Sequence, residues 1–249
     1  TGTARPETEL LVAWAIELLS GSELEGKSED LQNGWAWRSP GAHLPMGRAR
    51  RQPGGPPLVI DLGTGSGAVA LALTVANPDL MLYAVELSPE ALALARENVA
   101  AVGVTARVAL LRGDLFDPLG PLVGHVDLVI SNPPYIPSGT IPKLPREVRE
   151  YEPLEALDGG PDGMSVHRKI IAGAPRFLRP GGWLLLEMGE GHSDHLSRLL
   201  EAVGFADVQV RKDLSGVERM IGARWEGRGA AGGAGDQRRG AAGGAGGNA

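Results

Sequence analysis

The string Ser131-Asn132-Pro133-Pro134-Tyr135 holds the residue types that most narrowly define a chemistry. It ends an apolar run that is typical of a buried strand, and two prolines cannot donate ladder hydrogen bonds, so the strand must stop and the loop must be stiff. In such a loop the Asn132 side-chain oxygen and the Pro133 carbonyl can accept both hydrogens of a planar –NH₂ group, which Tyr135 can cover. The string therefore predicts a site for the amino group of a base or a carboxamide. Its candidate catalytic residues are Asn132, Pro133, Pro134 and Tyr135.

A glycine-rich turn, Asp61-Leu62-Gly63-Thr64-Gly65-Ser66-Gly67, follows another apolar run. Glycines tolerate positive φ and let the backbone approach a ligand of nucleotide type. The spacing is G-x-G-x-G rather than the G-x-G-x-x-G of dinucleotide-binding turns. Asp61 at the head of the turn would repel a pyrophosphate but would accept a hydrogen bond from a cationic amino-acid head.

Two more acids end neighbouring apolar runs. Glu86 lies about 20 residues beyond the glycines, where an acid can accept hydrogen bonds from both hydroxyls of a ribose. Asp114 can accept from an adenine amino group, with Leu115 and Phe116 beside the ring. The alternatives are a surface salt bridge for Glu86 and a turn or cap acid for Asp114. Together with the glycine turn, the two acids predict binding of S-adenosyl-L-methionine. The candidate cofactor-binding residues are Asp61, Gly63, Thr64, Gly65, Ser66, Gly67, Glu86, Asp114, Leu115 and Asn132.

A planar amino nitrogen is a weak nucleophile because its lone pair is delocalised. The site must therefore hold the nitrogen in line with a methyl group and strengthen its hydrogen bonds as positive charge develops. We predict neither a strong general base nor a metal, since the histidines show no H-E-x-x-H spacing and the chain has no cysteine.

These strings lie within an alternation of short apolar runs and helical patterns. Strands are predicted at 58–62, 81–87, 107–111, 126–131, 183–188, 205–210 and 218–221. Helices are predicted at 68–75, 89–102, 165–177 and 192–203, the second of them capped by Ser88 with Pro89 at its first position. The pattern predicts an α/β fold, a doubly wound and mostly parallel seven-stranded sheet of the Rossmann-like class I methyltransferase type. Ligands of such sheets bind beyond the carboxyl ends of the strands.

Composition divides the 249 residues into four parts. We expect an N-terminal helix in residues 1–19, a flexible insertion or linker in 20–57, the methyltransferase catalytic domain in 58–224 and a disordered Gly-rich tail in 225–249. The clustered Trp35 and Trp37 are unusual for a linker.

Charge and cysteine content restrict the partners. A net charge of −6 excludes a broad basic footprint for duplex nucleic acid, so no direct nucleic-acid binding is expected. The absence of cysteine excludes disulfides and thiol catalysis and is compatible with a reducing compartment. No apolar run reaches the roughly 20 residues of a membrane span, so we expect no membrane association. We further expect a cytoplasmic protein that is a monomer.

Several strings resemble those of the HemK-type protein-(glutamine-N5) methyltransferases, which modify peptide-chain release factors. They are Arg5-Pro6-Glu7-Thr8-Glu9, Asp61–Gly67, Ser131–Pro137, Glu147-Val148-Arg149 with Glu152-Pro153, Ala156-Leu157-Asp158-Gly159-Gly160, Leu178-Arg179-Pro180-Gly181-Gly182 and Arg211-Lys212-Asp213-Leu214. N-P-P-Y alone is shared with amino-group methyltransferases of DNA and RNA, whereas R-P-E-T-E and A-L-D-G-G are much narrower.

The resemblance implies that the substrate is the glutamine of the Gly-Gly-Gln loop of a release factor. It implies that Gly63, Gly65, Gly67 and Glu86 bind the cofactor and that the loop from Asn132 to Tyr135 holds the glutamine amide. It also suggests that Glu7 or Glu9 braces that loop; the alternative is that both acids face the helix dipole.

The chain departs from the family in three places. Family members usually carry a helical domain before R-P-E-T-E, but only four residues precede Arg5 here. The stretch before the first strand is longer than usual, and the family often has an aromatic residue where Leu115 stands. Two other functions therefore stay open, an amino-group methyltransferase for DNA or RNA bases and a catalytically impaired cofactor-binding fragment.

Overall fold

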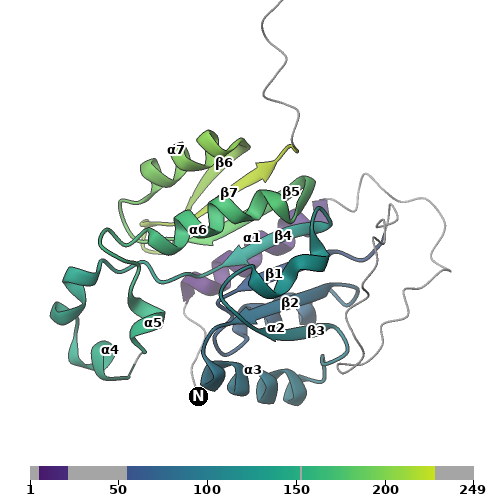
Figure 1. Cartoon of the computed structure of the whole chain (residues 1–249), viewed down its shortest axis with the longest axis horizontal. Coiled ribbons are helices and arrows are strands. Elements are labelled where there is room, and N and C mark those ends of the chain that lie inside the picture. The colour runs from purple at the N-terminus through teal and green to yellow at the C-terminus, as the bar shows by residue number, and fades with distance from the viewer. Residues whose placement is uncertain (1–5, 22–54, 152, 228–249) are drawn as a thin grey trace, which may run out of the picture.

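Seven strands form one sheet in the computed structural model, which describes residues 6–21, 55–151 and 153–227 (Figure 1). The spatial order is β3-β2-β1-β4-β5-β7-β6. β7 is antiparallel to both of its neighbours, and the other neighbouring pairs are parallel. The strands are β1 (Leu58–Leu62), β2 (Met81–Glu86), β3 (Val108–Arg112), β4 (Val126–Ser131), β5 (Leu178–Glu187), β6 (Phe205–Lys212) and β7 (Glu218–Trp225). The predicted fold class is confirmed.

Helices cover both faces of this sheet. Successive strand residues point to opposite faces, so Val59 packs with the core of one face and Ile60 with the core of the other. The first core includes residues of α1 (Pro6–Gly21), α2 (Ala68–Ala76) and α3 (Pro89–Val102), and the second those of α6 (Ser165–Gly173) and α7 (Ser193–Val203). The shorter helices are η1 (Asp117–Leu122), η2 (Ser138–Lys143), α4 (Arg146–Tyr151), α5 (Leu154–Leu157) and η3 (Ala174–Arg176).

The predicted start of α3 is confirmed. The Ser88 hydroxyl accepts a hydrogen bond from Ala91 N at 3.2 Å, and Pro89 occupies the first helical position. The helix ends at Gly103, whose φ of 78° lies in the left-handed region. At the N-terminal end of the helix, Ser88 N also donates to Glu86 Oε1 at 2.9 Å, which fixes Glu86 at the end of β2.

Some predicted boundaries are wrong. Strand β5 begins at Leu178 rather than Trp183, because the Arg179–Gly182 stretch continues beside β4 through a register shift. Helix α6 stops at Gly173, four residues early, because Pro175 cannot donate the next helical hydrogen bond. The elements η1, η2, α4 and α5 are too short to leave a periodic pattern.

The predicted tail begins too early. β7 continues to Trp225, which is 7% exposed and packs against Phe205 with ring centroids 5.4 Å apart. The remainder of the predicted tail from residue 228, and residues 22–54 of the predicted insertion with both tryptophans, lie outside the described residues. None of the described helices combines the length and the apolar character needed to cross a membrane.

Candidate active site

The two motif loops begin side by side at the carboxyl edge of the sheet. Leu62, the last residue of β1, pairs with Val85 of β2 and with Ser131 of β4. The Ser131 hydroxyl donates a hydrogen bond to the Leu62 carbonyl at 2.7 Å, with both groups buried. The glycine turn, Glu86 and the Asn132–Tyr135 loop therefore leave adjacent strands at the same level.

The glycine turn has an open surface and a fixed backbone. Gly63 N and Thr64 N both donate to the Val85 carbonyl, at 2.9 and 3.0 Å. Gly63, Gly65 and Gly67 have φ of 67°, 57° and 83°, the region that favours glycine. A Cβ on Gly63 or Gly65 would meet no described atom within 4 Å. The turn thus offers bare backbone to a ligand, and these residues fit the close approach predicted for the cofactor.

Asp61 lies beneath this turn rather than on its surface. It is 1% exposed and accepts a hydrogen bond from the Thr64 hydroxyl at 2.6 Å. Burial raises the pKa of Asp61 to about 7; the Thr64 bond opposes this shift, and the negative charge of Glu86 adds to it. The direct contact with a cationic head stays a prediction, because the carboxylate already supports the turn from inside.

Glu86 is held by backbone N–H groups on both sides. Its Oε2 accepts from Gly65 N at 2.8 Å and its Oε1 from Ser88 N at 2.9 Å. The alternative role for Glu86 was a surface salt bridge, but among the described residues Glu86 forms no ion pair. A carboxylate has about four acceptor sites, so each oxygen keeps one free for a hydroxyl. The two backbone bonds aim the carboxylate at the space beside the glycines.

The next strand end differs in part from the prediction. Asp114 is exposed and lies 3.9 Å from Lys169 Nζ. Leu115 has a φ of 47° and is partly buried. The Phe116 ring stacks on Phe177 at 4.8 Å, and its far side meets Gly173, where an added Cβ would come within 2.6 Å. Phe116 therefore packs against the core, and a place beside an adenine stays a prediction for Leu115 and Phe116 alike.

Two residues that the sequence reasoning missed hold the Asn132–Tyr135 loop. Asn132 Nδ2 lies 3.5 Å from Thr8 Oγ1, and Thr8 Oγ1 lies 3.5 Å from Glu187 Oε2. The Tyr135 hydroxyl donates to Glu187 Oε1 at 3.3 Å. Thr8 belongs to the R-P-E-T-E string, and Glu187 is a buried acid at the end of the apolar strand β5. An acid inside an apolar run is itself a signal that could have found it.

The brace that the resemblance suggests for Glu7 or Glu9 stays a prediction. Glu9 is exposed, and the side chain of Glu7 lies outside the described part of the chain. Among the described side chains of this string, Thr8 reaches the loop.

The A-L-D-G-G string forms hydrogen bonds with Ile136, the residue that follows the Asn132–Tyr135 loop. Ile136 N donates to the Leu157 carbonyl at 3.0 Å, and Gly159 N donates to the Ile136 carbonyl at 2.9 Å. Gly163 lies so close that a Cβ there would be 2.3 Å from the Tyr135 carbonyl oxygen. The loop is therefore pinned from both sides.

His167 is buried beside the same strand end. Its Nε2 lies 2.8 Å from the Glu187 carbonyl, and burial lowers the pKa of His167 to about 4. The ring is therefore neutral near pH 7, with Nε2 as the donor. Within the described ranges, no group of three or more acids and histidines could hold a metal ion.

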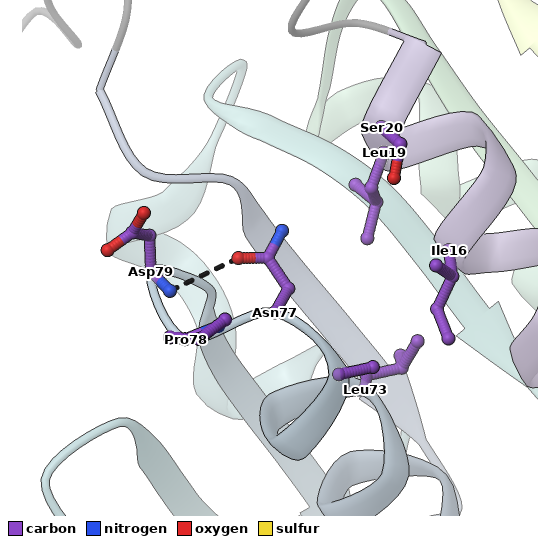
Figure 2. A pocket seen from close by; sticks show the side chains of 8 residues that line it. Ile16, Leu19, Ser20, Leu73, Asn77, Pro78 and Asp79 are labelled. Atoms are coloured by element: carbon purple, nitrogen blue, oxygen red, sulfur yellow. Dashed lines mark hydrogen bonds between the residues drawn. The ribbon is translucent and has the colours of Figure 1, made fainter.

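A hollow of about 260 Å³ lies at the opposite edge of the sheet. Figure 2 shows its lining, where the end of α1 (Ile16, Leu19, Ser20) faces Leu73 and the Asn77–Asp79 turn. None of the candidate residues lines it. The carboxyl edge, not this hollow, therefore carries the candidate site.

Known methyltransferases are similar to this chain in sequence. A protein-family model described as "Methyltransferase small domain" matches residues 53–142. A release factor glutamine methyltransferase of Geobacter sulfurreducens is 45% identical over 166 residues, which are 67% of this chain and 57% of that protein. One of Cereibacter sphaeroides is 46% identical over 166 residues, 67% of this chain and 59% of that protein. The chain thus spans less than two thirds of the length of these curated relatives.

A solved structure supports the fold. The hMettl16 catalytic domain, solved with an RNA hairpin, is 14% identical, covers 90% of this chain and 72% of that chain, and has a TM-score of 0.59. The curated relatives, not this structure, confirm the resemblance to release factor glutamine methyltransferases over 166 residues.

Proposed function

We propose that this chain, similar over its catalytic core to release factor glutamine methyltransferases, transfers a methyl group to the N5 nitrogen of the glutamine in the Gly-Gly-Gln loop of bacterial release factors. The proposal rests on the pairing of Leu62 with Ser131 at the ends of β1 and β4. This pairing places the Asn132–Tyr135 loop directly beside the open glycine turn. The names of the relatives supply the substrate.

The cofactor of this reaction is S-adenosyl-L-methionine, which supplies an activated methyl group when bound. In the proposal, the backbone of the glycine turn receives its amino-acid end and Glu86 accepts from its ribose hydroxyls. Asp114 accepts from the adenine amino group, with Leu115 beside the ring. The proposed cofactor residues are Asp61, Gly63, Thr64, Gly65, Ser66, Gly67, Glu86, Asp114, Leu115 and Asn132.

The loop residues act on the glutamine amide. Asn132 Oδ1 and the Pro133 carbonyl accept the two hydrogens of the –NH₂ group, Pro134 keeps the loop stiff, and Tyr135 covers the amide plane. As the nitrogen bonds to carbon it gains positive charge, so both hydrogen bonds strengthen in the transition state. The proton then leaves to a backbone carbonyl or to water.

The partner in this proposal is a folded release factor, which places the reaction in the cytoplasm. The catalytic domain corresponds to the described residues from 55 to 227 together with α1. The monomeric state and the absence of nucleic-acid binding stay predictions.

The proposal is tested with labelled cofactor and a purified release factor. The chain should label the wild-type factor and not a variant whose loop glutamine is alanine. Asn132→Ala should lower kcat by at least about a hundredfold, the loss expected when one hydrogen bond to developing charge is removed. Labelling of DNA or RNA alone would favour the nucleic-acid alternative, and cofactor binding without any turnover would favour a non-catalytic role.

A further inference from the structure

The contacts between α1 and the catalytic loop have a direction that follows from the groups involved. The Thr8 hydroxyl donates its one proton to Glu187 Oε2 at 3.5 Å. Thr8 Oγ1 then has only lone pairs left to offer Asn132. The side-chain amide of Asn132 must therefore turn its Nδ2 toward Thr8.

This direction decides which end of Asn132 faces away from α1. With Nδ2 held by Thr8, Oδ1 is the free end of the amide. The –NH₂ group of the substrate needs a hydrogen-bond acceptor. If the Asn132 amide were flipped, its Nδ2, itself a donor, would face this –NH₂ group. The two ends of an asparagine amide have nearly the same shape, so packing alone selects weakly between them.

We propose that Thr8 is a positioning residue, whose hydroxyl, held by Glu187, fixes the Asn132 amide with Oδ1 toward the substrate amide. This inference rests on the proposed function, because it concerns the same site.

Burial makes the chain of hydrogen bonds effective. Thr8 is 9% exposed and Glu187 is 1% exposed, so water competes poorly for these groups. Glu187 also accepts from the Tyr135 hydroxyl. One carboxylate therefore orients both polar side chains of the loop, Asn132 through Thr8 and Tyr135 directly.

The test compares a substitution that removes the Thr8 hydroxyl with one that keeps it. Thr8→Val keeps the shape and removes the hydroxyl, and it should lower kcat for release factor methylation about tenfold to a hundredfold, the loss typical of a misplaced group. Thr8→Ser restores the hydroxyl and should recover most of the rate. The matched control is Glu17→Ala, which changes an exposed acid of the same helix and should match the wild-type chain. Equal losses in Thr8→Val and Thr8→Ser would overturn the inference.

A double-mutant cycle separates orientation from general packing. In an Asn132→Ala background, Thr8→Val should cause no further loss, since the group through which it acts is gone. The same fold-loss in both backgrounds would mean that Thr8 acts independently of Asn132.

A spectroscopic measurement keeps the inference testable apart from activity. In ¹⁵N-labelled protein, the side-chain NH₂ resonances of Asn132 should shift in Thr8→Val and return in Thr8→Ser. Unchanged resonances in Thr8→Val would overturn the positioning role. A wild-type chain that leaves release factors unmethylated would instead overturn the proposed function, whatever the resonances show.

Discussion

The glycine turn and the Asn132–Tyr135 loop lie next to each other, but they are held in opposite ways. Residues Gly63–Gly67 of the turn are supported within 32 positions of the sequence, by Asp61, by Val85 and Glu86, and by Asn98 of α3. The loop is supported by α1, by the end of β5 and by the segment after α5.

This difference teaches where each part of the site is vulnerable. The turn keeps its geometry as long as β1, β2, α3 and their connections are intact. The loop is held by Thr8 and Glu187, which lie 124 and 52 positions from the residues that they contact, so it depends on α1 and β5 being packed in place. Changes far away in the sequence should therefore damage the loop and spare the turn.

The largest effect is expected at Gly163, where a side chain would strike the loop. Gly163→Ala adds a Cβ 2.3 Å from the Tyr135 carbonyl at a φ of 77°. Positive φ and overpacking together should lower the free energy of unfolding by about 3 kcal/mol, measured by urea titration. Gly103→Ala is the matched control, with a φ of 78° and no described atom within 4 Å, and should lose only about 1 kcal/mol. Equal losses would contradict the proposed clash.

The second prediction concerns pH and tests the local support of the turn. The raised pKa of Asp61, about 7, means that the folded chain binds this proton more tightly than the unfolded chain. The stabilisation is complete below about pH 4 and is lost as the pH rises toward 7. Between pH 5 and 7 the wild-type chain should lose about 2 kcal/mol of unfolding free energy relative to Asp61→Asn. Parallel pH profiles of the two proteins would show that Asp61 is already ionised in the fold.

The smallest effect is expected at Glu86, where a substitution should affect cofactor binding at the glycine turn and spare release factor binding at the Asn132–Tyr135 loop. Glu86→Gln should weaken cofactor binding about tenfold, because a charged acceptor for hydroxyls is lost, and should leave KM for the release factor unchanged. Glu90→Gln removes the same charge from an exposed acid nearby and serves as the control. Calorimetry with the cofactor measures both variants. An unchanged affinity in Glu86→Gln would mean that the ribose is bound elsewhere.

The sequence predicted the parts of the site that lie close together along the chain. Strands β1, β2 and β4 carry clear apolar runs that end in their motifs, so the positions of Gly63, Glu86 and Asn132 at one edge could be anticipated. The contacts of Thr8 and Glu187 could not, because they join residues 179 positions apart. Side-chain pairing at that distance leaves no periodic signal in one sequence.

Contacts between residues far apart in the sequence also explain two other differences from the predictions, at the end of β7 and at Phe116. The predicted last strand stopped at residue 221, yet β7 continues through Gly222, where a Cβ would lie 2.7 Å from the Trp14 ring. Phe116 looked available to a ligand, but Phe177, 61 residues later, stacks on it. In both cases a partner distant along the chain decides the role of a residue.

The close approach of Trp14 to Gly222 also bears on how the chain is made. Helix α1 packs on β4 and β5 and touches β7 through Trp14, and all three strands are synthesised after it. We expect a nascent chain halted before β5 to form the glycine turn while Thr8 still lacks its partner Glu187. The amide-holding side of the site would then mature only after β5 has been made.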